Sequence, residues 1–403
     1  MVEFFLSHGK HILAAVTVIT LAVLATTIHI SLYTNSRSLG MHHDSRQDEP
    51  VAGAASNPSY LTSTHLTSLI EGELAWLLSC SLPNGALAQS PGSNTVIPYF
   101  ANLAARKLLT IDAEAVRDYI IWYLSSLNKL DRWGLSGTIY DYKVEYLPHD
   151  NSSGTDGELK GIIMIPTGNY DSADSYASTF LSLLGEYYFT TGDRDLIRSN
   201  LPDISLVASV VVNLQDEDGL VFVKPGSWTK YLMDNAENYR GLMDWSQVLL
   251  EEGYADDADY LKHVAARIKD GIFNVLYEPE RGVFAWSASP IWKRFPRVGK
   301  WYPDGVSQLY LLTCGLISPE DPEAHAIWNT FVQNFPAWEI GVKKDRFPWT
   351  SVAVASLMMG DWDKALGFVD WAYGEYLLNG RPYPWYILES ADFVTLLELV
   401  TTQ

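Results

Sequence analysis

Residues 169–193 read NYDSADSYASTFLSLLGEYYFTTGD and contain the signals that decide the fold. Asp171 and Asp174 open this stretch, apolar residues then recur at helical spacing, and Thr191-Gly192-Asp193 closes it. Acids in a first turn and a glycine after the last periodic residue are start and stop signals of a helix. A second apolar-periodic run begins directly afterwards, at residue 195. The stretch therefore predicts two helices joined by a very short connection, which is an antiparallel helical hairpin.

The same signals divide the chain from residue 59 onward into twelve predicted helices. They cover residues 60–80, 94–109, 112–128, 172–191, 195–214, 233–252, 255–278, 304–316, 321–334, 348–359, 361–378 and 387–402. Short connections alternate with long ones rich in Trp, Tyr, Gly and Pro, and the longest, 129–170, has room for a small β-hairpin.

This alternation predicts an all-α fold, an (α/α)6 toroid, in which six hairpins form an inner ring of helices inside an outer ring. All long loops then lie on one rim, where the inner helices begin. Their predicted starts lie near Ile97, Asp171, Asp234, Asp304, Trp349 and Glu389. An open solenoid of helical pairs is the alternative, but no fixed repeat of about 34 to 45 residues is visible.

The chain before residue 59 has a different composition. Residues 12–33, ILAAVTVITLAVLATTIHISLY, carry no formal charge, and about 20 such residues cross a bilayer as a helix. We expect a transmembrane anchor there after a short cytoplasmic segment at 1–11, with a cleaved signal peptide as the alternative. Residues 34–58 are small and polar and predict a flexible linker. The toroid then spans 59–403 on the extracytoplasmic side.

The charge balance excludes several functions. The chain has 28 Lys and Arg against 48 Asp and Glu, a net charge of −20. Because phosphate backbones are bound by clustered basic residues, no nucleic-acid partner is expected. Cys80 and Cys314 form no CxxC motif and the nine His form no HExxH motif, so we expect no metal, no cofactor and two free buried thiols. Nothing in the sequence indicates an oligomeric state.

Acids spaced i, i+3 open three of the predicted inner helices. The pairs are Asp171 and Asp174, Asp234 and Glu237, and Glu389 and Asp392. Capping of the helix is the alternative role for each pair. Asp171, Asp174, Asp234 and Glu237 are the candidate catalytic residues. Since two acids at i, i+3 lie only about 5 to 6 Å apart at Cβ, each pair should supply one reacting group, expected to be Asp174 and Glu237, and one cap or substrate ligand.

Aromatic residues gather in the same segments. Candidate substrate-binding residues are Tyr170, Trp228, Tyr239, Arg240, Trp301, Tyr302, Asp304, Trp349, Trp385, Glu389 and Asp392. Rings beside carboxylates suit a sugar, because its C–H faces stack on rings while its hydroxyls bond to acids, amides and Arg. Core packing is the alternative for each ring, and Arg240 can instead orient Glu237 or face solvent. The pattern predicts a carbohydrate partner.

Together with KYLMDNAENYRGLMDW (230–245), NGALAQSP (84–91), VIPYFANLAARKLL (96–109) and WYPDGVSQLY (301–310), these segments resemble the six-hairpin glycosidases. That (α/α)6 group includes glucoamylase-like and family 8 glycoside hydrolases, and the resemblance covers residues 60–402. DSADSYASTFLSLL resembles the aspartate-bearing inner-helix motif of family 8, with Asp171 or Asp174 in its place. The acid motif of that family has no clear counterpart, since Glu71-Gly72-Glu73 lies on a predicted outer helix. The resemblance implies hydrolysis by an acid and a separate base, commonly with inversion.

We therefore expect a membrane-anchored glycoside hydrolase that acts on an extracytoplasmic oligo- or polysaccharide by carboxylate acid/base catalysis. A sugar epimerase or lyase on the same toroid is one alternative, with His149 as its evident proton-transfer group. A non-catalytic glycan-binding subunit of a polysaccharide machine is the other, in which the acids are caps and hydrogen-bond partners.

Overall fold

The computed structural model describes residues 63–147 and 161–402. They belong to the second of two compact units of the chain, Pro58–Gln403. The predicted membrane segment at 12–33, the linker at 34–58 and His149 lie outside the described residues. Among the helices of the described ranges, none has the length and apolar character needed to span a bilayer.

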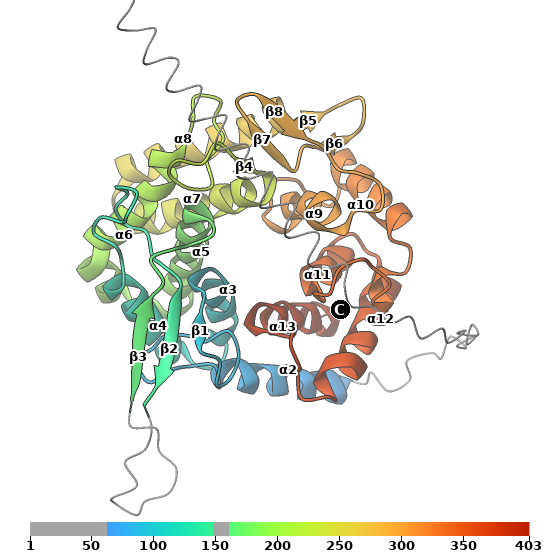
Figure 1. The fold of residues 1–403 in the computed structure, drawn as a ribbon, viewed down its shortest axis with the longest axis horizontal. Helices are drawn as coiled ribbons and strands as arrows, with labels where there is room; N and C mark the ends of the chain where they lie inside the picture. The colour runs from blue at the N-terminus through green and yellow to red at the C-terminus, as the bar shows by residue number, and fades with distance from the viewer. Residues whose placement is uncertain (1–62, 148–160, 403) are drawn as a thin grey trace, which may run out of the picture. The chain divides into compact units, whose positions relative to one another are not determined.

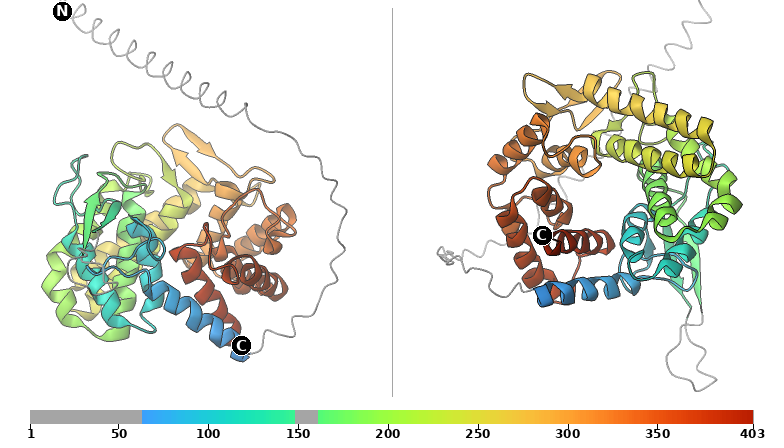
Figure 2. Two further views of the ribbon diagram at one scale, coloured as in Figure 1. Left: turned by 60° about the horizontal axis from the view of Figure 1, so that its bottom comes forward. Right: turned by 180° about the vertical axis from the view of Figure 1, so that it is seen from behind.

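The described part of the second unit contains twelve α-helices in two concentric rings (Figure 1). The inner helices are α3 (Pro98–Leu108), α5 (Ala173–Thr191), α7 (Leu232–Glu251), α9 (Val306–Thr313), α11 (Thr350–Met358) and α13 (Ile387–Thr401). The outer helices are α2 (Ser63–Leu78), α4 (Ala113–Ser125), α6 (Arg194–Leu214), α8 (Ala255–Gly271), α10 (Pro322–Asn334) and α12 (Trp362–Ala372). Each inner helix contacts the next inner helix along the chain, and α13 returns to contact α3. The predicted toroid and its inner and outer assignment are confirmed, as the views in Figure 2 also show.

Helix boundaries differ from the prediction at a few ends. The predicted helix at 94–109 begins only at Pro98, which occupies its first turn, where a proline costs no hydrogen bond. Single π-helical turns follow α8 (η2, Ile272–Leu276) and α12 (η5, Tyr373–Leu377) and precede α9 (η3, Trp301–Gly305). A 3-10 turn, η4 (Trp338–Ile340), lies between α10 and α11.

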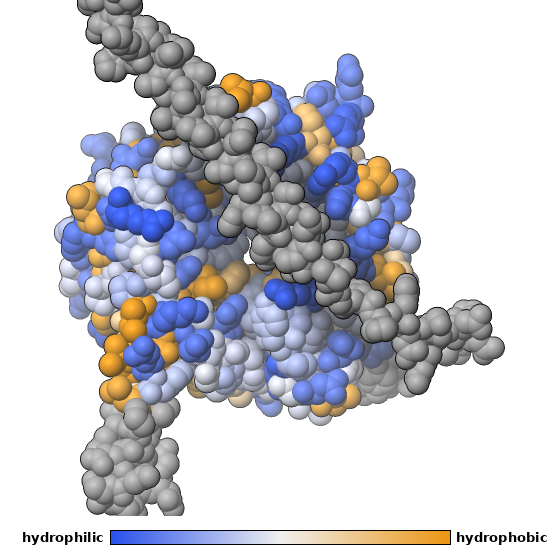
Figure 3. Space-filling view, in the orientation of Figure 1, coloured by the Kyte–Doolittle hydropathy of each residue, from blue (hydrophilic) through white to orange (hydrophobic). Residues whose placement is uncertain are grey.

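Short strands occupy the long connections. One antiparallel sheet has the order β1 (Thr95–Val96), β2 (Tyr142–Tyr146) and β3 (Ile162–Pro166), a second has β4 (Lys230–Tyr231), β7 (Ser287–Ser289) and β8 (Trp292–Arg294), and β5 (Tyr277–Glu278) pairs with β6 (Val283–Phe284). The predicted hairpin in 129–170 is therefore confirmed as β2 and β3, with Val144 opposite Met164. Exposed Ile163 and Ile165 give β3 the apolar patch visible in Figure 3.

Burial follows the sequence pattern of each ring. The outer helix α8 buries a stripe of Ala258, Leu261, Ala265 and Ile268 at helical spacing, as an amphipathic surface helix does. The inner helix α5 is buried on nearly every face from Ala173 to Gly185. Small and apolar residues all round are what a helix enclosed by neighbours requires.

The tightest contact in the inner ring joins α5 to α7 at Gly241. A Cβ atom added there would lie 2.2 Å from the backbone oxygen of Ser178. Only glycine allows this approach, so Gly241 fixes how closely the two acid-bearing helices pack.

We expect Gly241→Ala to lower the free energy of unfolding by about 2 kcal/mol or more, because overpacking a tight contact typically costs roughly 1 to 3 kcal/mol. Gly374→Ala is the matched control, since no atom lies within 4 Å of its added Cβ, and alanine is the better helix former. Urea unfolding of the purified variants measures both. Equal midpoints for Gly241→Ala and the unmodified protein would contradict this account of the contact.

Candidate active site

A cavity of about 390 Å³ lies where the inner helices begin, and we call it the cup. Asp171 and Ser172 before α5, Asp234 in the first turn of α7, Trp349 before α11 and Leu388 in α13 all line it. Its volume falls in the range of roughly 300 to 1,000 Å³ that is usual for small-molecule sites. The cup therefore forms at the rim where the sequence predicted it.

Two buried carboxyl groups come from the start of α7. Glu237 Oε1 accepts a hydrogen bond from the Tyr99 hydroxyl at 2.6 Å, and Asp234 accepts one from the Ser172 hydroxyl at 2.9 Å. Tyr99 belongs to α3, and Ser172 is the residue before α5. Three neighbouring inner helices thus hold these two acids in place.

Two further carboxyl groups lie on the same side. Asp141 directly precedes β2 and accepts a hydrogen bond from the Tyr176 hydroxyl of α5 at 2.8 Å. Asp171 is exposed to the cavity. With Asp234 and Glu237 they form a wall of four acids, which we call the acidic wall.

Burial and neighbouring charges raise the pKa values of Glu237, Asp234 and Asp141. Burial first, and then the charge of Asp234, raises the pKa of Glu237 to about 8. Burial, with a further contribution from Asp171, raises the pKa of Asp234 to about 7. Burial also raises the pKa of Asp141 to about 6. A carboxyl group whose pKa lies near neutrality can act as a proton donor at neutral pH.

A fifth acid reaches the cup from elsewhere in the ring. Asp345 lies in the loop before α11, is partly exposed, and accepts a hydrogen bond from the backbone N–H of Phe347 at 2.8 Å. Along the closed inner ring, α11 is three helices away from α5 in either direction, so this acid comes from the side facing the α5 segment. The cup therefore receives carboxyl groups both from the α5 and α7 side and from the α11 side.

Aromatic side chains complete the cup. Tyr302 stacks on Trp349 with ring centroids 4.7 Å apart, and both line the cavity. Tyr302 is 48% exposed and Tyr383, also in the lining, is 59% exposed. Such rings present open faces to a ligand.

The backbone at Trp349 is strained. Its φ is 60°, which is rare for a bulky residue and is often found at functional sites. Glu389 holds this turn, since its carboxylate accepts hydrogen bonds from the N–H groups of Trp349 at 3.1 Å and Thr350 at 2.8 Å. The Thr350 hydroxyl adds a third at 2.7 Å. Glu389 therefore fixes the turn that positions Trp349 against Tyr302.

The structure sorts the sequence-predicted residues into three groups. Those that line the cup are Asp171, Asp234, Glu237, Tyr302 and Trp349. Those packed in the protein outside it are Tyr170, Asp174, Tyr239, Trp301, Trp385 and Glu389. Those in other cavities are Trp228, in a surface cleft with Lys224 and Pro290, Asp304, in a cavity with Arg297 and Phe335, and Arg240 and Asp392, in a second cavity along the toroid axis.

Within the pairs Asp171 and Asp174, and Asp234 and Glu237, the structure places the side chains differently from the roles expected for them. Asp174 is fully buried between α5 and α7 and accepts a hydrogen bond from Asn238 at 2.9 Å. Asp171 and Asp234 do not cap, because the N-cap positions are Ser172 and Tyr231 and neither makes a side-chain cap bond. Asp174, in the first turn of α5, faces the neighbouring helix α7. Asp171, just before α5, and Asp234, in the first turn of α7, face the cavity.

Several predicted ligands instead build the rim. The Tyr170 hydroxyl donates to Asp131 at 2.6 Å, and the Trp385 indole donates to Glu73 at 3.2 Å. Asp304 accepts hydrogen bonds from the backbone and side chain of Arg297 at 2.9 and 3.1 Å. The other two residues, Trp301 and Tyr239, are held by aromatic and cation–π contacts. Trp301 packs against Phe331 and Phe335, and Tyr239 lies beneath Lys269.

Sequence reasoning missed Asp141 and Asp345. Both lie in long loops, so neither forms an i, i+3 pair on a helix. The signals were weak but present, since Asp141 opens the predicted hairpin and Asp345 stands four residues before Trp349. Within the described ranges, no three His, Cys, Asp or Glu side chains converge as a metal site would need.

Comparison with known proteins gives a structural answer only. No protein-family model and no curated protein sequence matches the chain. A solved structure of a wild-type glycosidase matches with a TM-score of 0.58 at 13% identity, over 84% of this chain and 98% of that chain. A GH63 mannosylglycerate hydrolase from Thermus thermophilus in complex with glucose matches with 0.56 at 12%, over 82% and 99%. A rhamnosidase from Klebsiella oxytoca with rhamnose bound matches with 0.57 at 12%, over 85% and 65%. The chain thus shares its fold with these glycosidases.

The raised pKa of Glu237 makes stability depend on pH. A carboxyl group with a raised pKa in the folded state stabilises that state fully below its ordinary pKa, and the contribution is lost as pH rises toward the folded value. For Glu237 this window runs from 4.5 to about 8. We therefore expect the free energy of unfolding to fall with pH across this window, and to fall less in Glu237→Gln, by at least about 1 kcal/mol.

Urea unfolding at several pH values measures these slopes. Glu251→Gln is the control, because this exposed acid lies on the same helix outside the cup and its removal should leave the slope unchanged. Parallel slopes for Glu237→Gln and the unmodified protein would show that Glu237 is not held protonated.

Proposed function

We propose that the protein is a glycoside hydrolase in which Glu237 donates a proton to the leaving group and Asp345 activates the attacking water. The observation that carries this proposal is the placement of carboxyl groups from both sides of one cup, where burial and crowding keep the acidic wall partly protonated. The glycosidases with this fold, two of them in complex with a sugar by their descriptions, support it.

Glu237 and Asp345 differ in burial and in hydrogen bonding, as the roles of proton donor and base require. Tyr99 occupies Glu237 Oε1, so the other carboxyl oxygen can carry the proton to the glycosidic oxygen. Asp345 is the more open of the two and takes a proton from water as that water attacks the anomeric carbon. The bond to the leaving group breaks, and the product receives the hydroxyl from the opposite face. This single displacement is inverting and requires carboxyl groups roughly 6.5 to 9.5 Å apart.

The lining of the cup favours a neutral sugar. Tyr302, Trp349 and Tyr383 offer rings for the C–H faces, and Asp141 and Asp171 offer acceptors for hydroxyls. No Lys or Arg is among the described residues that line the cup. A uronic acid or a phosphorylated sugar would therefore meet five carboxyl groups without a counter-ion.

The same lining argues against an epimerase or lyase. No His is among the described lining residues. Burial raises the pKa of the lining tyrosines Tyr99 and Tyr310 well above normal, which makes them poor proton acceptors at neutral pH. A glycan-binding subunit without activity remains an outcome of the test below.

The proposal includes the N-terminal segment. The uncharged run at 12–33 is long enough to anchor the enzyme, with the toroid on the extracytoplasmic side acting on an oligo- or polysaccharide. We expect the full chain to sediment with membranes and to resist extraction by carbonate. Recovery in the soluble fraction, or cleavage after the apolar run, would contradict the anchor.

Glycosyl fluorides test the roles of the two acids, because fluoride leaves without a proton. Glu237→Gln should lower kcat on ordinary neutral glycosides by about 10²- to 10⁴-fold and retain hydrolysis of the matching glycosyl fluoride. Asp345→Asn should lose both activities. Reducing-sugar release and fluoride release measure them, with Glu251→Gln as control.

The other outcomes are equally informative. Loss of both activities in Glu237→Gln would remove it from the donor role. No release by the unmodified protein on any neutral glycan, with sugar binding retained, would favour the glycan-binding subunit.

A further inference from the structure

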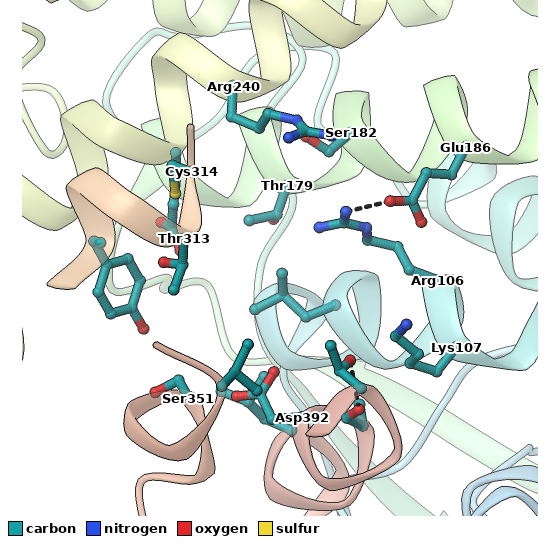
Figure 4. A pocket seen from close by; sticks show the side chains of 17 residues that line it. Arg106, Lys107, Thr179, Ser182, Glu186, Arg240, Thr313, Cys314, Ser351 and Asp392 are labelled. Atoms are coloured by element: carbon teal, nitrogen blue, oxygen red, sulfur yellow. Dashed lines mark hydrogen bonds and ion pairs between the residues drawn. The ribbon is translucent and has the colours of Figure 1, made fainter. Parts of the chain in front are cut away.

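A second cavity of about 230 Å³ follows the axis of the toroid beyond the cup, and we call it the axial chamber. All six inner helices or their caps contribute to its lining, and Figure 4 shows their side chains pointing into it. Glu237, Tyr310 and Leu388 line both the axial chamber and the cup. These three residues therefore form the partition between the two cavities, and the proposed proton donor has access to both.

The axial chamber reaches solvent on the face away from the cup. Arg106 and Lys107 lie in the last turn of α3, which is the end opposite the cup. Their side chains are 26% and 25% exposed, and those of Glu186 and Arg240 are 36% and 41% exposed. A solvent path thus leads from that face to Glu237 without crossing the cup.

Polar side chains share the lining with apolar ones such as Leu103, Val354 and Leu388. Hydroxyl groups from Thr179, Ser182, Thr313 and Ser351 surround the space in Figure 4. Arg106 pairs with Glu186 and Arg240 with Asp244. A cavity of this size, lined by these hydroxyl and charged groups, has both the room and the hydrogen-bonding partners to hold several water molecules.

Asp392 is the one acid of α13 that lines this space (Figure 4). Among the described residues its carboxyl group makes no hydrogen bond or ion pair. Burial, with the nearby charge of Glu389, raises its pKa to about 8, while Lys107 and Arg106 act in the opposite direction. The other charged and titratable groups that line the axial chamber are Arg106 and Lys107 from α3, Glu186 from α5, Glu237 and Arg240 from α7, and Tyr310 and Cys314 from α9 and its end. From α11 only Ser351 and Val354 face it.

We propose that the axial chamber returns the proton to Glu237 after each turnover, by way of Asp392 and water, from the face opposite the cup. This inference rests on the proposed function, in which Glu237 protonates the leaving group. Each turnover leaves Glu237 ionised and Asp345 protonated. Asp345 releases its proton to solvent at the mouth of the cup, and Glu237 takes one from the axial chamber, so no net proton is consumed. A sugar still bound in the cup then does not block the reset.

The test compares two substrates in the full-length protein. Val354→Phe should fill the axial chamber without touching the cup, and Val354→Ala is the matched control that keeps it open. Asp392→Asn removes the relay group alone. We expect Val354→Phe and Asp392→Asn to lower kcat on a neutral glycoside by about tenfold with little change in KM, and to leave kcat on the matching glycosyl fluoride unchanged. Imidazole buffer should restore part of the Asp392→Asn rate, because a small buffer can carry the proton.

Each other outcome decides against one part of the scheme. Variants that match the unmodified protein on both substrates, while Glu237→Gln shows the selective loss, would overturn the proton path and leave the proposed function standing. Equal losses on both substrates would show that the axial chamber acts through packing. If Glu237→Gln itself loses both activities, the proposed function fails first. Should Val354→Phe not fold, Asp392→Asn and its buffer response carry the test.

Discussion

Closure of the inner ring is the constraint on which the rest of the structure depends. When α13 packs against α3, six helices that are remote in sequence direct their N-terminal ends to one cavity. First-turn residues and the loops before them then share that cavity, whatever their separation along the chain. Helix N-termini also favour negative charge, which makes this rim a tolerable place to gather acids. Gly241 shows how tightly the ring closes, since even one added carbon would meet the backbone of α5.

The electrostatics of the cup follow from this closure. Helix dipoles favour ionised carboxyl groups, but the pKa values of Glu237, Asp234 and Asp141 are all raised. Burial and mutual repulsion therefore outweigh the dipoles. Glu237, Asp234 and Asp141, with their raised pKa values, thus lie across the cup from a more open acid, Asp345. That asymmetry between buried and open carboxyl groups is what separates a proton donor from a base in one small space.

Much of this could be predicted from the sequence, because closure depends on helix order and loop length. The hairpin signals predicted every inner helix, and the acids at their starts led to Asp171, Asp234 and Glu237. The direction of each side chain could not be derived in the same way. Successive helical residues differ by about 100° around the axis, so an error of one residue at a helix start exchanges a cavity-facing acid for a buried one. Asp174 is the example. Asp141 and Asp345 depend on loop paths, and the supporting role of Glu389 depends on the turn at Trp349, neither of which helical periodicity describes.

The charged groups in the axial chamber need a separate explanation, because closure of the ring does not require them. Apolar side chains of suitable volume could fill the space, and replacing enclosed ion pairs by such residues often stabilises a protein. Instead the inner helices present Arg106, Glu186, Arg240 and Asp392 to it. The side chains of Arg106, Glu186 and Arg240 keep contact with solvent there, which lowers the cost of placing their charges inside the ring. A fold selected for stability alone would have no reason to keep this arrangement. The proposed resupply of protons to Glu237, which lines both cavities, gives it one.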